Sequence, residues 1–272
     1  SEKLKKSPLD IANNIKEDLD NLDLFKKISV AGPGFLNFNL NSGIITNQLK
    51  EIILLENNYG KNDSFKNQTI LVEFVSANPT GPLTVGHGRG AILGDTLSNV
   101  FEWNGYDVTR EYYYNNAGRQ MRVLGESVKA RYLENQDRDY SFPDEGYQGE
   151  YIYDIATQLS KKFGDTLIRR NNVFRTSAEK YIFNNIKETL NKININFDSF
   201  FNENTLYKNK DIYTVIDKLK AKGLIYEKDN ATWFHGTKVG RESDKVLIKS
   251  SGEPTYRLPD MAYHIKKIER GY

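Results

Sequence analysis

The segment Gly86–Gly90, GHGRG, alternates three glycines with a histidine and an arginine. A β-branched and aromatic run at 69–75 predicts a buried strand before it, and apolar residues at helical spacing from Ala91 onward predict a helix after it. The start of a helix binds anions because its first N–H groups lack partners and carry the positive end of the helix dipole. Glycine lets a ligand approach that backbone closely. We therefore expect this segment to bind a nucleotide or another phosphate compound.

Two other interpretations of the same segment remain open. A tight strand-to-helix connection without a ligand would also use glycine, although such turns rarely need three. The sequence GHGRGA satisfies the G-x-G-x-x-A pattern of dinucleotide-binding folds, with Glu111 about 20 residues further on as the ribose acid. Against this NAD(P)-binding reading, ten residues, Ser76–Val85, separate the predicted strand from the first glycine. A polar loop of this length is itself expected to line a site.

The composition narrows the class of protein. Of the 272 residues, 38% are hydrophobic and 27% charged, and the net charge of +2 means that any nucleic-acid surface must be local. The chain has no cysteine and its three histidines lie far apart, so we expect no disulfide and no protein-bound metal. No apolar run approaches the roughly 18 residues of a membrane span, and no signal-peptide pattern opens the chain. These features favour a cytoplasmic protein without a membrane partner.

A small α+β unit is expected before the central strand. It would consist of a helix capped by Ser7-Pro8, a half-buried strand at 35–40 (FLNFNL) and a helix at 44–55. The polar stretch 57–68 is a candidate domain boundary.

The central elements predict an α/β fold. The strand at 69–75, the helix after it and a second strand at 106–113 have the order of a right-handed crossover in a parallel sheet. Residues from about 135 to 228 are mostly helical and charged in pattern, which indicates an insertion rather than sheet. The other expected elements are a helix at 115–133, short strands at 224–226, 232–235 and 246–249, and a last helix at about 259–269.

Four stretches along the chain carry a family resemblance. They read ISVAGPGFLNF near the start, VEFVSANPTGPLTVGHGRGAILGD in the centre, YDVTREYYYNNAGRQM after the second strand and GEPTYRLPDMAYHIKKIERGY at the end. Together they resemble, in family order, the arginyl-tRNA synthetases of bacterial type, which are class I aminoacyl-tRNA synthetases. Two positions depart from the family: Thr84 stands where its nucleotide motif usually begins with histidine, and Asn116 stands where aspartate is common.

The resemblance implies a reaction and its substrates. The arginine carboxylate would attack the α-phosphate of ATP, accompanied by Mg²⁺, to give arginyl-adenylate, and the arginyl group would pass to the 3′ end of its tRNA. Such chemistry needs no protein nucleophile, since alignment and charge stabilisation carry phosphate-centred displacements.

Motif matches also carry substrate roles to individual residues. ATP would contact Thr84, Gly86, His87 and Gly88, with His87 as the catalytic residue that donates to the phosphates. Arginine would be held at its guanidinium by Tyr256, Asp260 and Glu203, and at its amino and carboxylate ends by Ser76, Asn78 and Gln120. Paired carboxylates suit this task because they accept a guanidinium in bidentate fashion and discriminate against an ammonium. By spacing alone, Glu203 would be a solvated loop acid, and Ser76 and Asn78 would be turn formers.

The resemblance also predicts how the chain is organised. Residues 1–60 would be part of a tRNA-contacting N-terminal domain, and 61–272 a truncated Rossmann-like catalytic domain with the mainly helical insertion at about 135–228. We expect the chain to be a fragment that lacks the second nucleotide motif and the anticodon-binding domain. An NAD(P)-linked dehydrogenase and a non-catalytic RNA-binding paralogue remain the alternatives.

Overall fold

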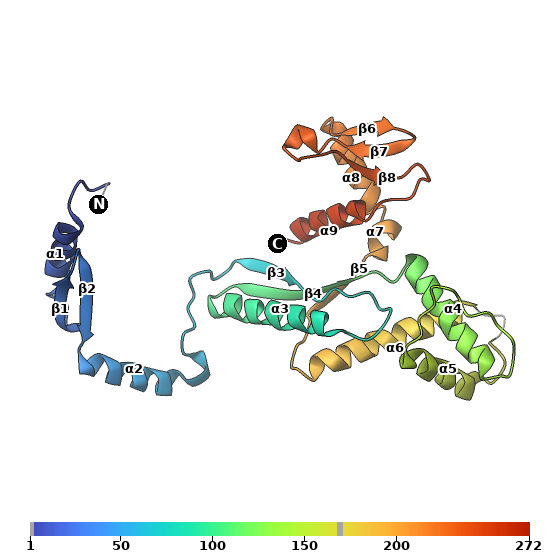
Figure 1. Cartoon of the computed structure of the whole chain (residues 1–272), viewed down its shortest axis with the longest axis horizontal. Helices are drawn as coiled ribbons and strands as arrows, with labels where there is room; N and C mark the ends of the chain where they lie inside the picture. The colour runs from blue at the N-terminus through green and yellow to red at the C-terminus, as the bar shows by residue number, and fades with distance from the viewer. Residues whose placement is uncertain (1–2, 168–170) are drawn as a thin grey trace. The chain divides into compact units, whose positions relative to one another are not determined.

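The computed structural model describes residues 3–167 and 171–272 of the chain (Figure 1). Two compact units make up the chain, Ser1–Asn62 and Asp63–Tyr272, and they divide within the polar stretch 57–68. Within the described ranges, no helix combines the length and the apolar character that a membrane span requires.

In the first unit a helix packs against a two-stranded hairpin. Helix α1 (Pro8–Leu19) begins as the sequence predicted, because the Ser7 side chain accepts a first-turn N–H at 3.1 Å and Pro8 occupies a position that needs no donor. Strands β1 (Phe25–Ala31) and β2 (Phe35–Leu40) pair in antiparallel fashion.

Strand β2 is more exposed than its alternating pattern predicted. Phe38 is 47% and Leu40 51% exposed, so the expected half-buried face is wrong. Among the described residues of this unit only Ala12 and Ile28 are buried apolar side chains, because α1 alone packs on the hairpin. Helix α2 (Ser42–Leu55) and the short 3-10 helix η1 (Glu56–Asn58) follow, and α2 buries no side chain.

The second unit is built on a parallel sheet, as the sequence predicted. Strand β3 (Thr69–Glu73) leads into helix α3 (Val85–Trp103) and then strand β4 (Asp107–Tyr114), with Thr69 paired to Asp107. A third parallel strand, β5 (Ser199–Asn202), lies beside β4 and gives the order β3-β4-β5.

Strand β5 lies inside the segment 135–228 that the sequence assigned to a mainly helical insertion, so the assignment missed it. The strand has four residues, and its pairing of Ser199 with Glu111 joins positions 88 residues apart. Periodicity within a short window cannot reveal such a pairing.

Helix α3 packs on the sheet through small residues. Its buried positions are Ala91, Gly94 and Ser98, which recur at helical spacing. A Cβ at Gly94 would lie 2.2 Å from the ring of Phe74, which is itself only 8% exposed. Glycine therefore lets the helix approach the strand that precedes it.

We expect Gly94→Ala to destabilise the protein by about 1–3 kcal/mol, because the added methyl group overpacks a closed contact. Gly90→Ala is the matched control, since it lies in the same helix and a Cβ there meets nothing within 4 Å. The control should be stabilising by roughly 0.5–1 kcal/mol, as alanine is the better helix former. Urea unfolding of both variants measures the difference, and equal stabilities would contradict this packing.

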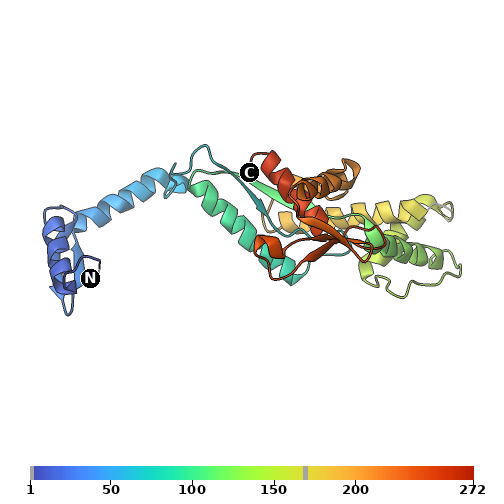
Figure 2. The same ribbon diagram turned by 90° about the horizontal axis from the view of Figure 1, so that it is seen from above.

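Three further helices form a cluster beside the sheet (Figures 1 and 2). They are α4 (Gly118–Glu134), α5 (Glu150–Phe163) and α6 (Asn171–Asn191), and α4 packs on both of the others. Their apolar faces share a core with the sheet, whose fully buried members include Met121, Leu124, Val128, Ile152, Ile155, Phe174, Ile182 and Ile186.

The remaining elements have a second core. They are α7 (Asn204–Lys208), α8 (Asp211–Ala221), β6 (Ile225–Lys228), β7 (Ala231–Phe234), the 3-10 helix η2 (Thr237–Val239), β8 (Lys245–Ile248) and α9 (Arg257–Glu269). Strands β6, β7 and β8 form an antiparallel sheet in that order, and α9 lies against α8. The sequence predicted these three strands and the last helix to within three residues at each end.

Candidate active site

The carboxyl ends of β3, β4 and β5 lie at one edge of the sheet, where ligands bind in open parallel sheets. The residues that follow them include Ser76 and Asn78 after β3, Asn115 after β4 and Glu203 after β5. Sequence-predicted site residues that are far apart along the chain therefore come together here.

The chain leaves β3 in a constrained conformation. Val75 and Ser76 have φ angles of 64° and 45°, a region that non-glycine residues rarely adopt. Two bonds hold Ser76 there, because its hydroxyl donates to Glu73 Oε1 at 3.0 Å and accepts the Tyr113 N–H at 3.2 Å. Such strain is typical of functional sites.

The buried hydroxyl of Tyr112 fixes the same loop. It donates to the Ala77 carbonyl at 2.8 Å and accepts the Ala77 N–H at 3.1 Å. Burial raises the pKa of Tyr112, so the hydroxyl remains a donor at physiological pH. The loop is thus anchored to β4 at two adjacent residues, Ser76 through Tyr113 and Ala77 through Tyr112.

A chain of amides connects this loop to Glu203. Asn78 Nδ2 donates to Gln120 Oε1 at 3.3 Å, and Asn78 Oδ1 accepts the Asn115 N–H at 3.0 Å. Asn115 Nδ2 in turn donates to Glu203 Oε1 at 2.7 Å. Three of the predicted residues, Asn78, Gln120 and Glu203, therefore belong to one network.

Glu203 is a constrained, partly buried carboxylate rather than a solvated loop acid. Tyr113 Oη donates to its Oε2 at 2.6 Å. Burial raises the pKa of Glu203 and the nearby Asp260 raises it further, while the hydrogen bonds from Tyr113 and Asn115 act in the opposite direction. The site thus holds two carboxylates close enough to repel each other.

Asp260 lies in the first turn of α9 and completes this acidic group. Its partial burial raises its pKa; His264 and Lys267 lower the pKa, and Glu73 raises it. Lys267 is itself bound to Glu73 at 2.7 Å. A group of three carboxylates with one bound lysine favours a cationic ligand.

Tyr256 stands apart from this network. It is the residue before α9, is 69% exposed and lies against the Arg257 guanidinium at 4.6 Å. Among the described residues, no hydrogen bond joins its hydroxyl to Glu203 or Asp260. In the described part of the chain, no hydrogen bond therefore joins Tyr256 to the carboxylates with which it is expected to hold the guanidinium of arginine.

The segment Gly86–Gly90 is already helical, which corrects the expectation that the helix starts after it, at Ala91. Helix α3 begins at Val85, and none of the three glycines has a positive φ angle. Thr84 is the cap: its Oγ1 accepts the His87 N–H at 3.5 Å, and His87 Nδ1 accepts the Thr84 N–H at 3.0 Å. This reciprocal pair is a capping box with histidine in the usual glutamate position.

The cap fixes which histidine nitrogen can donate. Because Nδ1 accepts a backbone N–H, the neutral ring carries its proton on Nε2. A Cβ at Gly88 would meet nothing within 4 Å, so the glycine serves no packing contact and leaves open space at the first turn of the helix. Among the described residues, no hydrogen bond occupies His87 Nε2, so this N–H at the helix start can donate to a phosphate ligand.

Comparison with known proteins identifies the family. Residues 48–271 match the family profile described as "tRNA synthetases class I (R), catalytic domain", and residues 1–40 match "Arginyl tRNA synthetase N terminal domain". The chain belongs to the class I arginyl-tRNA synthetase family.

Individual relatives agree with this assignment. The chain is 49% identical to an arginine–tRNA ligase of Desulfotalea psychrophila and 50% identical to one of Pelodictyon phaeoclathratiforme, covering 98% of this chain in each case. A Campylobacter jejuni crystal structure assigned to arginyl-tRNA synthetase superposes with a TM-score of 0.78 at 33% identity, covering 86% of this chain and 52% of that one. The chain spans about half the length of the curated relatives it matches, 49% and 50%.

Glu111 has a structural role that sequence reasoning missed. Its side chain is fully buried in β4, where it accepts two bonds from Arg270 at 2.5 and 2.8 Å, one from Tyr263 at 2.6 Å and one from Ser199 at 2.8 Å. With these four bonds, Glu111 cannot also bind a ribose hydroxyl. This argues against the interpretation of GHGRGA as a dinucleotide-binding motif. Only the alternation of side chains along β4 could have indicated that Glu111 faces α9 while Tyr112 faces the opposite side.

Proposed function

We propose that this chain provides the arginine-activating site of an arginine–tRNA ligase. The observation that carries the proposal is the acidic group at the carboxyl edge of the sheet, where Glu203 and Asp260 are near each other. A guanidinium would relieve their mutual repulsion and can donate two parallel hydrogen bonds to a carboxylate. An ammonium cannot donate in this bidentate geometry. Ser76, Asn78 and Gln120, at the same edge, are suited to the amino and carboxylate ends of the amino acid.

ATP is assigned to the start of α3, with Mg²⁺ accompanying its phosphates. His87 Nε2 would donate to the phosphates, and Gly86 and Gly88 would leave the backbone open to the nucleotide. Thr84 replaces the histidine usual in the family, and its hydroxyl caps the helix instead of contributing charge. In the reaction, the arginine carboxylate attacks the α-phosphate and pyrophosphate leaves, so the chain contributes alignment and charge stabilisation rather than a nucleophile.

Pyrophosphate exchange on the full-length gene product tests the proposal. With its tRNA present, exchange should depend on arginine and not on lysine, and labelled arginine should appear on the tRNA. Binding of tRNA without any exchange would instead support a non-catalytic RNA-binding paralogue, and binding of NAD in place of ATP would support a dehydrogenase.

His87→Ala should weaken transition-state stabilisation in pyrophosphate exchange by roughly 1.5–3 kcal/mol, the scale of a hydrogen bond to a charged group. His87→Gln is the informative comparison, because a glutamine at this position retains the capping box and keeps a donor. Exchange kinetics for both variants show whether a side chain that keeps both the cap and a donor restores the rate that alanine loses. An unchanged rate in His87→Ala would remove His87 from the ATP site.

A further inference from the structure

One residue of β4, Tyr113, contacts both ends of the proposed arginine site. Its backbone N–H donates to the Ser76 hydroxyl at 3.2 Å, and its own hydroxyl donates to Glu203 Oε2 at 2.6 Å. In the function proposed above, Ser76 lies at the amino and carboxylate end of arginine, and Glu203 lies at the guanidinium. A single residue therefore connects the groups that would hold opposite ends of one ligand.

The end of the strand pairing fixes Ser76. Strand β3 pairs with β4 up to Glu73, which lies opposite Glu111. The Tyr113 N–H lies two residues beyond this last pair, and the Ser76 hydroxyl accepts it in place of a strand carbonyl. The same hydroxyl donates to Glu73 Oε1 at 3.0 Å, and the φ angle of Ser76 is 45°. Two bonds and a rarely adopted backbone conformation thus place this end of the site on β4.

The packing of the Tyr113 ring fixes the Glu203 end. The ring lies against those of Phe201 and Tyr263, with centroid separations of 6.1 and 4.5 Å, and these two rings are 4.7 Å from each other. Tyr263 is only 3% exposed, and its hydroxyl donates to the buried Glu111 at 2.6 Å. The Tyr113 hydroxyl therefore cannot move without repacking this aromatic cluster, so Glu203 keeps a constant position relative to β4.

The two oxygens of Glu203 are held by separate donors. Burial raises the pKa of Tyr113, and its hydrogen bond to Glu203 raises it further, so the hydroxyl stays protonated and donates. Asn115 Nδ2 donates to the other oxygen, Oε1, at 2.7 Å. Asp260, in the first turn of α9, differs, because no hydrogen bond between described residues occupies its carboxylate. Glu203 is therefore the fixed acceptor of the acidic group, and Asp260 is the one that can adjust to a ligand.

The fixed separation of the two ends matches the length of one side chain. From its backbone nitrogen to its hydroxyl, an extended tyrosine spans about the same distance as arginine does from its α-amino group to its guanidinium carbon. A site with two fixed ends rejects a longer or shorter ligand, because one polar end is then left without a partner. Resting on the function proposed above, we propose that Tyr113 is a positioning residue that sets the distance between Ser76 and Glu203 and thereby selects a guanidinium amino acid by the length of its side chain.

Isothermal titration of the full-length gene product, without tRNA, tests this proposal in the variant Tyr113→Phe. The ligands are arginine, homoarginine, which is one methylene longer, and norarginine, which is one methylene shorter. The wild type should bind arginine about 10–200-fold more tightly than either analogue, the usual effect of one methylene. In Tyr113→Phe the affinity for arginine should fall about tenfold, since Glu203 loses one of its hydrogen-bond donors. The preference for arginine over both analogues should also fall several-fold, because a carboxylate that is no longer fixed can follow a longer or shorter ligand.

The pH dependence of arginine affinity gives a second readout. Burial raises the pKa of Glu203 and Asp260 raises it further, while the hydrogen bonds from Tyr113, Asn115 and Tyr207 lower it. Removing the Tyr113 hydroxyl therefore raises the pKa of Glu203, so the variant should lose arginine affinity on acidification at a higher pH than the wild type. A variant that only loosened the fold would lower the affinity by the same factor at every pH.

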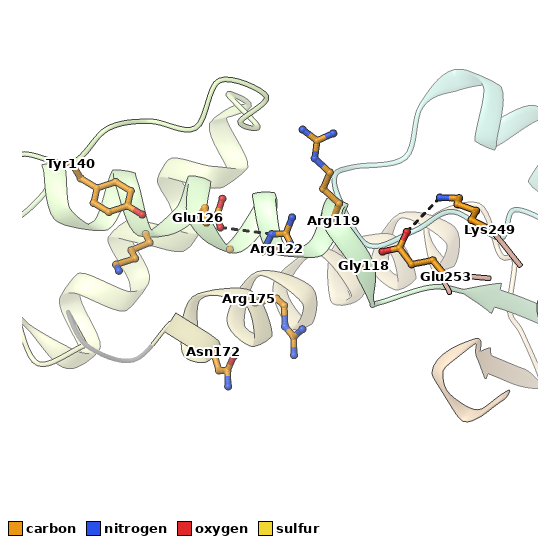
Figure 3. Close-up of a pocket in the computed structure, with 11 residues that line it drawn as sticks. Gly118, Arg119, Arg122, Glu126, Tyr140, Asn172, Arg175, Lys249 and Glu253 are labelled. Carbon is orange, nitrogen blue, oxygen red and sulfur yellow. Dashed lines mark hydrogen bonds and ion pairs between the residues drawn. The ribbon is translucent and has the colours of Figure 1, made fainter. Parts of the chain in front are cut away.

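Two control variants separate this geometry from general effects. Tyr114→Phe removes a hydroxyl from the next position of β4, on the opposite face of the sheet, where the ring packs on Phe183 at 4.7 Å. Arg119→Ala removes an exposed cation that pairs with Glu145 at 2.7 Å and lines a groove of about 860 Å³ along α4 (Figure 3). Tyr114→Phe should leave all three affinities unchanged. Arg119→Ala should change them by one common factor, because it alters only the local charge.

The outcomes distinguish failure of this proposal from failure of the proposed function. If the wild type binds none of the three amino acids, the proposed function fails and the length selection fails with it. If the wild type binds arginine and Tyr113→Phe keeps the wild-type preferences and pH dependence, only the role of Tyr113 is overturned. Preferences that fall in either control as they do in Tyr113→Phe would overturn it as well. Should Tyr113→Phe not fold, Asn115→Ala frees the other oxygen of Glu203, and an unchanged preference in that variant would equally overturn the proposal.

Discussion

Arg270→Met should lower the free energy of unfolding by about 2–4 kcal/mol. The variant leaves the fully buried carboxylate of Glu111 without its charged partner, and breaking such a pair typically costs about 3–5 kcal/mol. We place the value lower because Tyr263 and Ser199 still donate to Glu111, and because the Arg270 side chain is itself 33% exposed. Urea denaturation followed by circular dichroism measures the change.

The pH dependence of the stability difference between wild type and Arg270→Met identifies the Glu111 carboxylate as the cause of that difference. Burial would raise the pKa of Glu111, but the hydrogen bonds from Arg270, Tyr263 and Ser199 outweigh it and hold the pKa below its ordinary value of 4.5. The wild type therefore has this stabilisation above about pH 4.5 and loses it as the pH falls through the lower folded-state pKa. In Arg270→Met the carboxylate takes up a proton more readily, so the difference from wild type should shrink on acidification.

Glu111→Gln/Arg270→Met is the control, since it removes both charges from the pair. The double variant should recover part of the stability, because a neutral amide costs less to bury than an unpaired carboxylate. If the double variant is as unstable as the sum of the two single variants, the two residues do not act as a pair.

The local elements of the fold were predictable because they depend on short windows of sequence. The strand at 69–75, the helix after it and the strand at 106–113 have clear periodicity, and their parallel pairing follows from the crossover rule. The start of α1 was predictable for the same reason, as Ser7 and Pro8 act on the first helical turn. The pairing of β5 with β4 was not predictable, because it joins residues 88 positions apart.

The candidate site was predictable in its residue types but not in its contacts. The family motif led to Glu203 and Asp260, yet the bonds that fix Glu203 come from Tyr113 and Asn115, which no short-range pattern connects to it. His87 illustrates the opposite error. The glycines around it suggested a turn, whereas Thr84-x-x-His87 is a helix cap that could have been recognised from the spacing of an N-cap threonine and a side-chain acceptor three residues later.

Asp260→Asn should weaken arginine binding by about 2–5 kcal/mol in the full-length gene product, because the guanidinium loses a charged partner at a partly desolvated site. Tyr256→Phe should cost only about 0.5–1.5 kcal/mol, as it removes one neutral hydrogen bond. Isothermal titration with arginine, with and without tRNA, measures both values. Small and equal effects would mean that arginine binds elsewhere.

Loss of the fold cannot explain the expected effect of Asp260→Asn. Burial raises the pKa values of Asp260 and Glu203, so the charged forms of both groups are disfavoured in the folded protein. The stability that these groups contribute is therefore fully present below their unfolded-state pKa. It is lost as the pH rises through their higher folded-state pKa values. Removing one charge at neutral pH should therefore leave the melting temperature unchanged or raise it, while arginine affinity falls. Wild-type affinity should also decline on acidification from a higher pH than an ordinary carboxylate would require, because binding needs both groups ionised. An Asp260→Asn variant that melts lower than wild type would show that Asp260 stabilises the fold rather than binding a cation.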